Sequence, residues 1–487
     1  MVRSFAIVLF LMSCLTSSAA DVQVDFSNIV GKVNPRLHSS GWAPRTCPRT
    51  MGEDDADIAA MNLYACRTHD WALVNAGQRT VDTQYIFPLM HLDAKDPKNY
   101  FFTATDESLK LAHGVGLKVL YRLGTSIEHT KEYHCNALAP SDAEKYAEVL
   151  AGIMRHYLRG WANGYEWADR FDGWEIWNEP DNVPKCWVLP DCTEQDAVKR
   201  TAQHQTAFCK FFAIVLKRLK AEFPDQRIGG PGLSWADTKY FTELLDACKA
   251  QGVTPDFVSW HDYTCAPRGA LGGCARMRKL LDSRGLQDVR TMITEWHYLV
   301  SWEHTCGFGS ATPASMHQAY EGPSGHLNID SAALNLALLC EFQHCGLDEA
   351  YYYGLGTTWK WGYKNAYNEF NKTWYSMKMF GDFTRACGDR VATSVATNRP
   401  TVYACAGLGK DGKTASLVVV DYRGQSPKLT VGIRGLSDVA SVAAVCLDHA
   451  RDLVPVPVRL QDGVLTLPRA DANSAAFLVT FRRSGAK

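Results

Sequence analysis

The sequence predicts an α/β protein, a (β/α)8 TIM barrel followed by a C-terminal antiparallel β-sandwich domain. From Asn34 onward, short apolar runs alternate repeatedly with helical patterns, which is typical of a barrel of parallel strands. From about residue 381, short β-rich runs between turn residues replace that rhythm, as in an antiparallel sandwich. The chain of 487 residues also exceeds the usual size of one domain.

The first segment, residues 1–20, is predicted to be a secretory signal peptide. Arg3 supplies the positive charge, residues 5–11 the apolar run, and residues 18–20 a small-residue cleavage site. An alternative is the run 11–14, which is similar to a lipoprotein box and would anchor the chain at Cys14, although Met12 fits that box poorly. We expect a secreted, periplasmic or extracellular protein, and no other segment is apolar for long enough to span a membrane.

Residues 21–33 precede the barrel, and their alternating apolar residues predict a strand. Because a closed barrel has no free edge, we expect this strand to pair with the C-terminal sandwich. The barrel itself is assigned to residues 34–380 and the sandwich to 381–487. The eight barrel strands are expected at 36–38, 61–66, 117–122, 171–177, 227–230, 257–260, 290–294 and 349–353.

Sixteen cysteines in a secreted chain favour disulfide bonds over metal ligands. We expect bridges from Cys186 to Cys192 and from Cys265 to Cys274, each holding a loop that follows a barrel strand. A group at Glu128, His129, His134 and Cys135 matches no zinc spacing, so no metal and no cofactor is predicted. The net charge of −1 has no basic excess that would indicate nucleic-acid binding.

In such a barrel, catalytic residues lie at the C-terminal ends of the strands. Polar and aromatic residues follow five of the predicted strands: Arg67 and His69, Asn178 and Glu179, His261 and Tyr263, Glu295 and Trp296, and Trp359 and Trp361. Two carboxylates among hydrogen-bonding and aromatic groups are what glycoside hydrolysis requires. Glu175, deeper in the fourth strand, is kept as an alternative acid.

Glu179 follows an aromatic strand and precedes Pro180, which disfavours helical backbone at the residue before it. We therefore expect Glu179 in an extended conformation at a strand end. Walls formed by Trp174 and Trp177 would exclude water, and poor solvation raises the pKa of a carboxyl group towards that of a general acid.

Several motifs resemble known enzymes. Trp-Asn-Glu-Pro at 177–180, His-Asp-Tyr at 261–263 and Thr-Glu-Trp at 294–296 are similar to motifs of the clan A glycoside hydrolases. Arg-Thr-His at 67–69 and the run Trp-Tyr-Ser-Met-Lys-Met-Phe at 374–380 most resemble glycoside hydrolase family 39, the family of β-xylosidases and α-L-iduronidases. The resemblance covers roughly residues 30–380.

The resemblance implies that Glu179 is the acid/base and Glu295 the nucleophile. It implies that Asn178 holds the 2-hydroxyl of the sugar, and that Arg67 and Tyr263 hydrogen-bond the nucleophile. The other expected substrate-binding residues are His69, His261, Trp296 and Trp359. Alternatives remain for some of them: His261 and Tyr263 could be core residues, and Trp359 and Trp361 could be packing residues.

The resulting hypothesis is a secreted retaining glycoside hydrolase without a cofactor, exo-acting on xyloside-like oligosaccharides or polysaccharides. The alternatives are an endo-acting glycanase on the same scaffold and a catalytically silent glycan-binding barrel. Retention predicts carboxyl groups about 5 to 5.5 Å apart, whereas an inverting enzyme needs roughly 6.5 to 9.5 Å.

Overall fold

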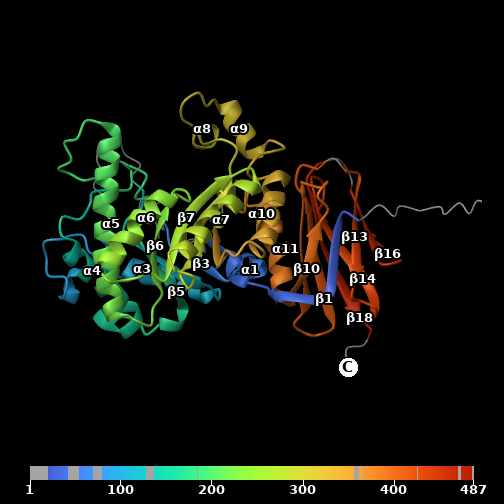
Figure 1. The fold of residues 1–487 in the computed structure, drawn as a ribbon, viewed down its shortest axis with the longest axis horizontal. Helices are drawn as coiled ribbons and strands as arrows, with labels where there is room; N and C mark the ends of the chain where they lie inside the picture. The colour runs from blue at the N-terminus through green and yellow to red at the C-terminus, as the bar shows by residue number, and fades with distance from the viewer. Residues whose placement is uncertain are drawn as a thin grey trace, which may run out of the picture.

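The computed structural model describes residues 20–41, 54–69, 79–127, 137–183, 185–355, 361–365, 367–424, 426–469 and 473–484. Residues 1–19 of the predicted signal peptide, which include Cys14, lie outside these residues, as do Trp359 and the group from Glu128 to Cys135. The chain forms a barrel surrounded by helices and, beside it, an antiparallel sheet domain (Figure 1). No helix in the described part of the chain has the length and apolar character needed to cross a membrane.

The barrel consists of eight strands that pair in chain order and close on themselves. All its strand pairs are parallel, so the predicted fold class is confirmed. Its strands are β2 (Ser39–Gly41), β3 (Ala65–Arg67), β4 (Lys118–Leu123), β5 (Phe171–Ile176), β6 (Ile228–Leu233), β7 (Phe257–Thr264), β8 (Arg290–Tyr298) and β9 (Glu349–Tyr352).

The first predicted strand, at residues 36–38, is wrong. Pro35–Leu37 is a short 3-10 helix, and the strand begins only at Ser39. Pro35 presets φ for a turn, and the Asn34 side chain accepts a hydrogen bond from the Arg36 backbone N–H, which favours turn over strand. The second strand also starts later than expected, because α1 (Asp55–Met61) occupies its predicted first residue.

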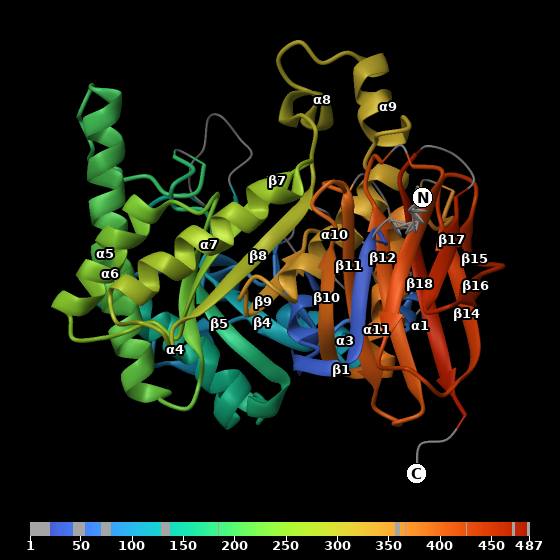
Figure 2. The same ribbon diagram turned by 45° about the vertical axis from the view of Figure 1, so that its right-hand side comes forward.

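Helices cover the outside of the barrel: α2 (Thr83–Ile86), α3 (Thr103–Gly114), α4 (Ala143–Arg159), α5 (Ala197–Glu222), α6 (Thr238–Ala250), α7 (Pro267–Ser283), α10 (Ile329–Phe342) and α11 (Lys372–Ala386). Three of them begin at an aspartate whose side chain accepts a backbone N–H of the first turn, namely Asp142, Asp196 and Asp237. Short 3-10 helices lie at Pro97–Asn99, Trp161–Asn163 and Ala168–Arg170. Two short helices, α8 (Trp302–Cys306) and α9 (Pro313–Glu321), project beyond the ends of β7 and β8 (Figure 2).

The second domain is one hydrogen-bonded sheet of ten strands in the order β15-β14-β18-β12-β11-β10-β1-β13-β17-β16. It curls around its own apolar core, which includes Val24, Leu417 and Phe477. Its strands are β1 (Val22–Lys32), β10 (Cys387–Val395), β11 (Val402–Gly409), β12 (Thr414–Asp421), β13 (Lys428–Arg434), β14 (Val439–Leu447), β15 (Asp452–Val456), β16 (Arg459–Gln461), β17 (Val464–Pro468) and β18 (Ala475–Arg483). The N-terminal strand β1 lies between β10 and β13 and belongs to this domain.

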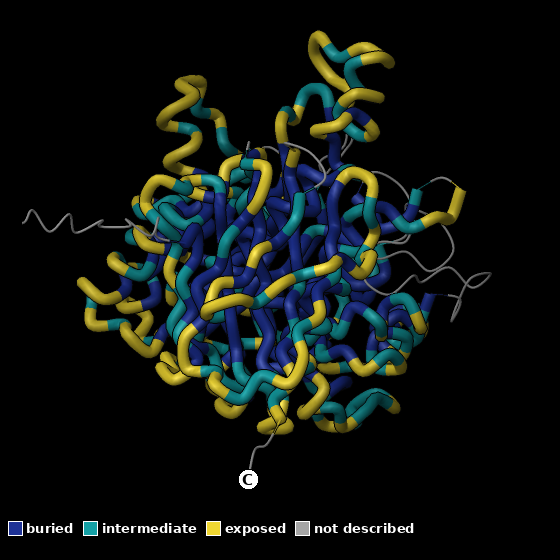
Figure 3. The backbone as a smooth tube through the Cα atoms, turned by 90° about the vertical axis from the view of Figure 1, so that its right-hand side faces the viewer, coloured by how far each residue is buried: buried dark blue, intermediate teal, exposed yellow. Residues whose placement is uncertain are grey.

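The two domains are joined by hydrogen bonds near the ends of β7 and β8. Arg423 of the sheet domain donates to the Asp330 carboxylate and to the Tyr298 hydroxyl, at 2.9 and 2.8 Å. The Tyr422 hydroxyl donates to the Cys265 carbonyl at 2.7 Å. Buried backbone runs through the interior of the protein (Figure 3), and Val418 and Val420 of the sheet domain belong to the same apolar core as the barrel. The sheet domain therefore supports the strands that end at the site described below.

The two expected disulfide bonds are wrong: in the structure no bridge joins Cys186 to Cys192 or Cys265 to Cys274. The Cys192 thiol donates a hydrogen bond to Gln203. Cys274 points from α7 into the buried layer, where it interacts with the Cys345 thiol. Short spacing in the sequence therefore did not bring these thiols together.

Candidate active site

The polar residues that follow the barrel strands converge at the C-terminal ends of β3, β5, β7 and β8. Glu295 lies at their centre, on β8. The register between β7 and β8 shifts between the pairs Trp260–Ile293 and His261–Glu295, which leaves Thr294 as the extra residue of a bulge. Such bulges change the direction of side chains near active sites, and this one sets Glu295 opposite His261.

Two strong donors hold the Glu295 carboxylate. Arg67 donates from Nη1 to Oε1 at 2.7 Å, and the Tyr263 hydroxyl donates to Oε2 at 2.6 Å. Hydrogen bonds to the charged form of a carboxyl group stabilise that form. Burial, followed by the charge of Glu295, raises the pKa of Tyr263 well above its ordinary value, so its hydroxyl stays a donor. The Glu295 carboxylate is thus held in a fixed orientation by both of its oxygens, as a nucleophile requires.

Glu179 lies three residues beyond β5, on a strained turn. Its φ is +46° and that of Trp177 is +78°, so the extended conformation expected before Pro180 is wrong. A left-handed non-glycine backbone costs about 1–3 kcal/mol and is often found at functional sites. The turn is tied down by the Trp177 N–H, which donates to the Leu123 carbonyl, and the Glu179 N–H, which donates to the Gly232 carbonyl.

The wall around Glu179 is also different from the one predicted. Trp174 and Trp177 point outward into the helical layer, where Trp177 contacts Trp187 and Phe211 and Trp174 stacks on Phe171. The carboxylate instead accepts hydrogen bonds from the His261 Nδ1–H at 2.8 Å and the Asn182 amide at 3.1 Å.

These contacts reverse the expected change in the pKa of Glu179. Burial alone raises its pKa, but the hydrogen bond and positive charge of His261 outweigh burial, and the pKa is lowered. The pKa of His261 is raised, because Glu295 and Glu179 together overcome the opposing effect of burial. In the free protein, one proton is therefore shared between Glu179 and His261, on the histidine side.

The two carboxylates lie close together, with His261 between them. One oxygen of Glu179, one oxygen of Glu295 and a ring nitrogen of His261 all lie within 4.8 Å of one another. His261 Nδ1 is 3.4 Å from Glu295 Oε2.

Two further predicted residues line the same site. Asn178 is buried, and its Oδ1 accepts a hydrogen bond from Arg67 Nη2 at 2.8 Å. His69 places Nε2 3.8 Å from Glu295 Oε1. Burial, partly opposed by Glu295, lowers the pKa of His69 to about 3, so its ring is neutral.

Trp296 was wrongly predicted to contact substrate. Its side chain is 1% exposed and packs outside the barrel against Phe342 and Tyr352. Since successive side chains on a strand point to opposite faces, placing Glu295 inward turns Trp296 outward. Trp359 lies outside the described residues, so its predicted role stays a prediction, while Trp361 lies 6.1 Å from Tyr263 between ring centroids.

Sequence reasoning missed several residues at the site. Asn182 follows the motif closely, and its amide type was the only signal. Tyr353 stands between His69 and Trp361, at 5.6 and 5.7 Å between ring centroids. Trp302 on α8 lies 4.8 Å from Tyr263 and is 47% exposed, but nothing in its sequence context connects it with the catalytic strands.

Glu179, His261 and Glu295 are also the described residues whose ligand atoms could surround a metal ion. Their environment favours proton transfer instead. The Arg67 guanidinium lies against Glu295, and Tyr263 donates to the Glu295 oxygen nearest His261. A cation there would face a fixed positive charge and displace an existing hydrogen bond.

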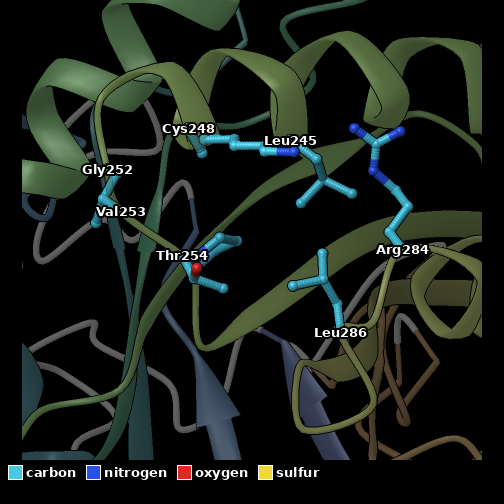
Figure 4. A pocket seen from close by; sticks show the side chains of 9 residues that line it. Leu245, Cys248, Gly252, Val253, Thr254, Arg284 and Leu286 are labelled. Atoms are coloured by element: carbon cyan, nitrogen blue, oxygen red, sulfur yellow. The ribbon is translucent and has the colours of Figure 1, made fainter.

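A cavity of about 490 Å³ lies elsewhere, between α6 and α7 (Figure 4). Its lining includes Cys248, Thr254, Arg284 and Leu286. Thr254 precedes β7 and Leu286 precedes β8, so this cavity is at the N-terminal end of the strands, opposite the two carboxylates. It contributes nothing to the site.

The model of the glycosyl hydrolases family 39 matches residues 56–313, more than half of the chain. A curated "Beta-xylosidase" of Caldicellulosiruptor saccharolyticus is 26% identical over 133 residues, which is 27% of this chain and 23% of that protein. The matched segment is therefore less than a quarter of that relative.

Solved structures with the same fold cover nearly the whole chain. A glucosidase from Croceicoccus marinus is 19% identical with a TM-score of 0.73, covering 96% of this chain and 99% of its own. A family 39 β-xylosidase from Caulobacter crescentus is 16% identical with a TM-score of 0.64, covering 95% and 99%. A family 51 α-L-arabinofuranosidase from Thermotoga petrophila is 13% identical with a TM-score of 0.64, covering 95% and 100%. At these identities the likeness concerns the fold.

Proposed function

Because the chain belongs to the glycosyl hydrolases of family 39, we propose that it is a retaining glycoside hydrolase with Glu179 as acid/base and Glu295 as nucleophile. The observation that carries this proposal is the pair of carboxylates itself. Their oxygens approach within 4.8 Å, near the spacing of about 5–5.5 Å at which one carboxylate attacks the sugar directly. An inverting enzyme would need space for a water molecule between substrate and base.

In the first step, Glu295 attacks the anomeric carbon while the bond from that carbon to the leaving oxygen breaks. Glu179 gives its proton to the leaving oxygen, and a glycosyl ester of Glu295 forms. Arg67 and Tyr263 orient the attacking carboxylate through their hydrogen bonds. In the second step, Glu179 removes a proton from water, the water oxygen attacks the anomeric carbon, and Glu295 leaves.

His261 holds the proton that Glu179 needs as an acid. Its Nδ1 is hydrogen-bonded to Glu179 Oε1, so the proton reaches the carboxylate by one short transfer and does not have to come from bulk water. When substrate covers the site and the negative charge of Glu295 begins to pass into the forming bond, the positive form of His261 loses part of its stabilisation. The His261 proton moves to Glu179 in the same step, as Glu179 protonates the departing oxygen.

For the substrate, we propose a xyloside-like glycan cleaved from its end. The support is the family and the relatives whose names are β-xylosidases. An endo-acting enzyme is the second candidate, because Trp302 and Trp235, which are 47% and 54% exposed, lie near the two carboxylates. Trp235 adjoins Ser234, whose N–H donates to Asp181 at 3.0 Å, two residues beyond Glu179. Exposed aromatic rings are suitable surfaces for additional sugar residues.

We also propose that the enzyme is secreted. The support is the sequence of residues 1–20, with its basic, apolar and small-residue parts.

The decisive test is hydrolysis of a panel of 4-nitrophenyl glycosides, with product configuration followed by NMR. We expect turnover of the β-xyloside with the β-anomer formed first, and none by Glu295→Ala. A first product of inverted configuration would exclude the double displacement. The catalytically silent alternative would be supported by binding of glycans without any turnover.

A further inference from the structure

We propose that Glu175 is a positioning residue that fixes Arg67, so that one guanidinium holds both the nucleophile Glu295 and the sugar-binding amide of Asn178. The inference rests on the proposed function and adds a residue that the two-carboxylate mechanism does not use. Glu175 lies four residues before Glu179 on β5 and is fully buried inside the barrel.

The three nitrogens of the Arg67 guanidinium each have a different partner. Nε donates to Glu175 Oε2 at 2.6 Å, Nη1 to Glu295 Oε1 at 2.7 Å, and Nη2 to Asn178 Oδ1 at 2.8 Å. A guanidinium is planar and its donors have a rigid arrangement. Holding the Nε–H therefore determines where the two Nη groups point, and Glu175 is the partner that holds it.

Glu175 is itself held in place by Ser259 of β7. The Ser259 hydroxyl donates to its Oε1 at 2.6 Å, and Ser259 Oγ accepts the Gly232 N–H at 2.8 Å. Gly232 has a φ of +63°, and a Cβ there would lie 3.2 Å from Glu175 Oε1 and 3.3 Å from Arg67 Nη2. Only glycine allows the backbone of β6 so close to this pair. The supporting chain thus runs from Gly232 through Ser259 and Glu175 to Arg67.

A buried carboxylate at this position is costly, since removing it from water costs several kcal/mol that its partner must offset. An amide could accept the same hydrogen bond from Arg67 without that cost. The negative charge of Glu175 has an effect that an amide would lack. It attracts the Arg67 guanidinium towards β5 and so opposes the attraction of Glu295. Arg67 then keeps one Nη for Asn178, instead of turning both towards the nucleophile in the bidentate geometry that arginine prefers with carboxylates.

Glu175 does not reach the reacting atoms, because Arg67 stands between it and Glu295. Its effect must therefore appear through both residues that Arg67 holds. Loss of orientation at Glu295 slows attack on any glycoside. Loss of orientation at Asn178 matters only for a sugar that has a 2-hydroxyl. The effect through Asn178 therefore distinguishes a positioning role of Glu175 from general damage to the fold, which would affect both kinds of sugar equally.

The test compares Glu175→Gln with the wild type on 4-nitrophenyl β-D-xyloside and on its 2-deoxy analogue. We expect kcat/KM on the xyloside to fall about 10²-fold, the size of effect that a misplacement of about 1 Å produces. The fall on the 2-deoxy analogue should be several-fold smaller, because that substrate never used Asn178. Equal losses on the two substrates, or no loss, would overturn the inference.

Asp172→Asn is the matched control. Asp172 is also a buried carboxylate of β5 with an arginine partner, Arg36, at 2.6 Å, but it lies at the opposite end of the strand. Its variant should lower the two activities equally or leave both unchanged. If Glu175→Gln fails to fold, Glu175→Asp permits the same comparison, since the shorter side chain withdraws the carboxylate from Arg67 Nε.

The outcomes for the two proposals are distinct. Activity that survives in Glu295→Ala overturns the proposed function. An active wild type that depends on Glu295, but with equal losses for Glu175→Gln on both substrates, overturns only the role of Glu175. A wild type that hydrolyses no glycoside overturns both, because the inference assigns Glu175 a part in that reaction.

Discussion

His261 Nδ1 lies 2.8 Å from Glu179 Oε1, so the carboxyl group proposed as the general acid shares its proton with a buried imidazole. This contact joins β7 to the loop after β5 and places a positive charge between two acids. It makes the proton of the general acid depend on a histidine of another strand.

Replacing His261 with Asn should raise the pKa of Glu179. Burial raises the pKa of Glu179, and the hydrogen bond and charge of His261 lower it to a net decrease. Asparagine can keep a neutral hydrogen bond but removes the charge, so burial prevails and the pKa of Glu179 rises. The alkaline limb of the wild-type kcat/KM profile reports the proton that Glu179 and His261 share, so the pKa of Glu179 itself is measured by NMR titration of its carboxyl carbon in the two proteins. A lower pKa of Glu179 in His261→Asn would contradict the prediction.

Glu179→Ala should separate the two chemical steps. A general acid contributes about 10²–10⁴-fold, so xylosides with poor leaving groups should lose that much. Activated 4-nitrophenyl substrates should still react in the first step and accumulate the glycosyl ester of Glu295. Added azide should release a glycosyl azide of retained configuration, identified by NMR. An azide product of inverted configuration would exclude a covalent intermediate on Glu295.

Trp302→Ala should weaken binding of longer glycans. The indole is 47% exposed and contacts Tyr263, and an aromatic platform contributes about 0.5–1.5 kcal/mol beyond its area. We expect KM for xylo-oligosaccharides to rise several-fold, with less change for the aryl monosaccharide. Phe308→Ala is the control, because Phe308 is 56% exposed just beyond the same helix. Equal changes in the two variants would show that Trp302 has no specific contact.

Arg227→Ala should destabilise the fold without altering specificity. At the N-terminal end of the barrel, Arg227 is 2.7 Å from Asp172 and also bonded to Glu349, and both carboxylates are buried. Removing the only partner of a buried charge costs about 3–5 kcal/mol, but Arg36 still pairs with both carboxylates. We therefore expect a smaller loss, measurable as the free energy of unfolding in urea.

The stability lost in Arg227→Ala should depend on pH, because Glu349 titrates near neutral pH. Burial and the neighbouring Asp172 raise the pKa of Glu349 to about 7. Below that pH the carboxyl group is increasingly protonated and needs its arginine less. The destabilisation by Arg227→Ala should therefore shrink as the pH falls below about 7. A loss that does not change with pH would show that the arginine acts through packing alone.

Much of the fold was predictable because its signals are local. The buried strands β5, β7 and β8 are short apolar runs with polar residues directly after them, and the helices between them have capping aspartates such as Asp196. Where a local signal was ambiguous, prediction failed. At residues 36–38 the pattern of apolar residues predicted a strand, but Pro35 and Asn34 favour the turn that the structure contains.

The sequence by itself therefore determined the barrel, the second β-domain and the strand ends at which Glu179 and Glu295 stand. Only the tertiary structure decided what surrounds those carboxylates. His261 contacts Glu179 across 82 positions of the sequence and Arg67 contacts Glu295 across 228, and a local motif contains no information about such partners. The direction of Trp296, the neighbours of the cysteines and the pKa of Glu179 all depend on distant segments that pack together, because burial and charge act through space and not along the chain.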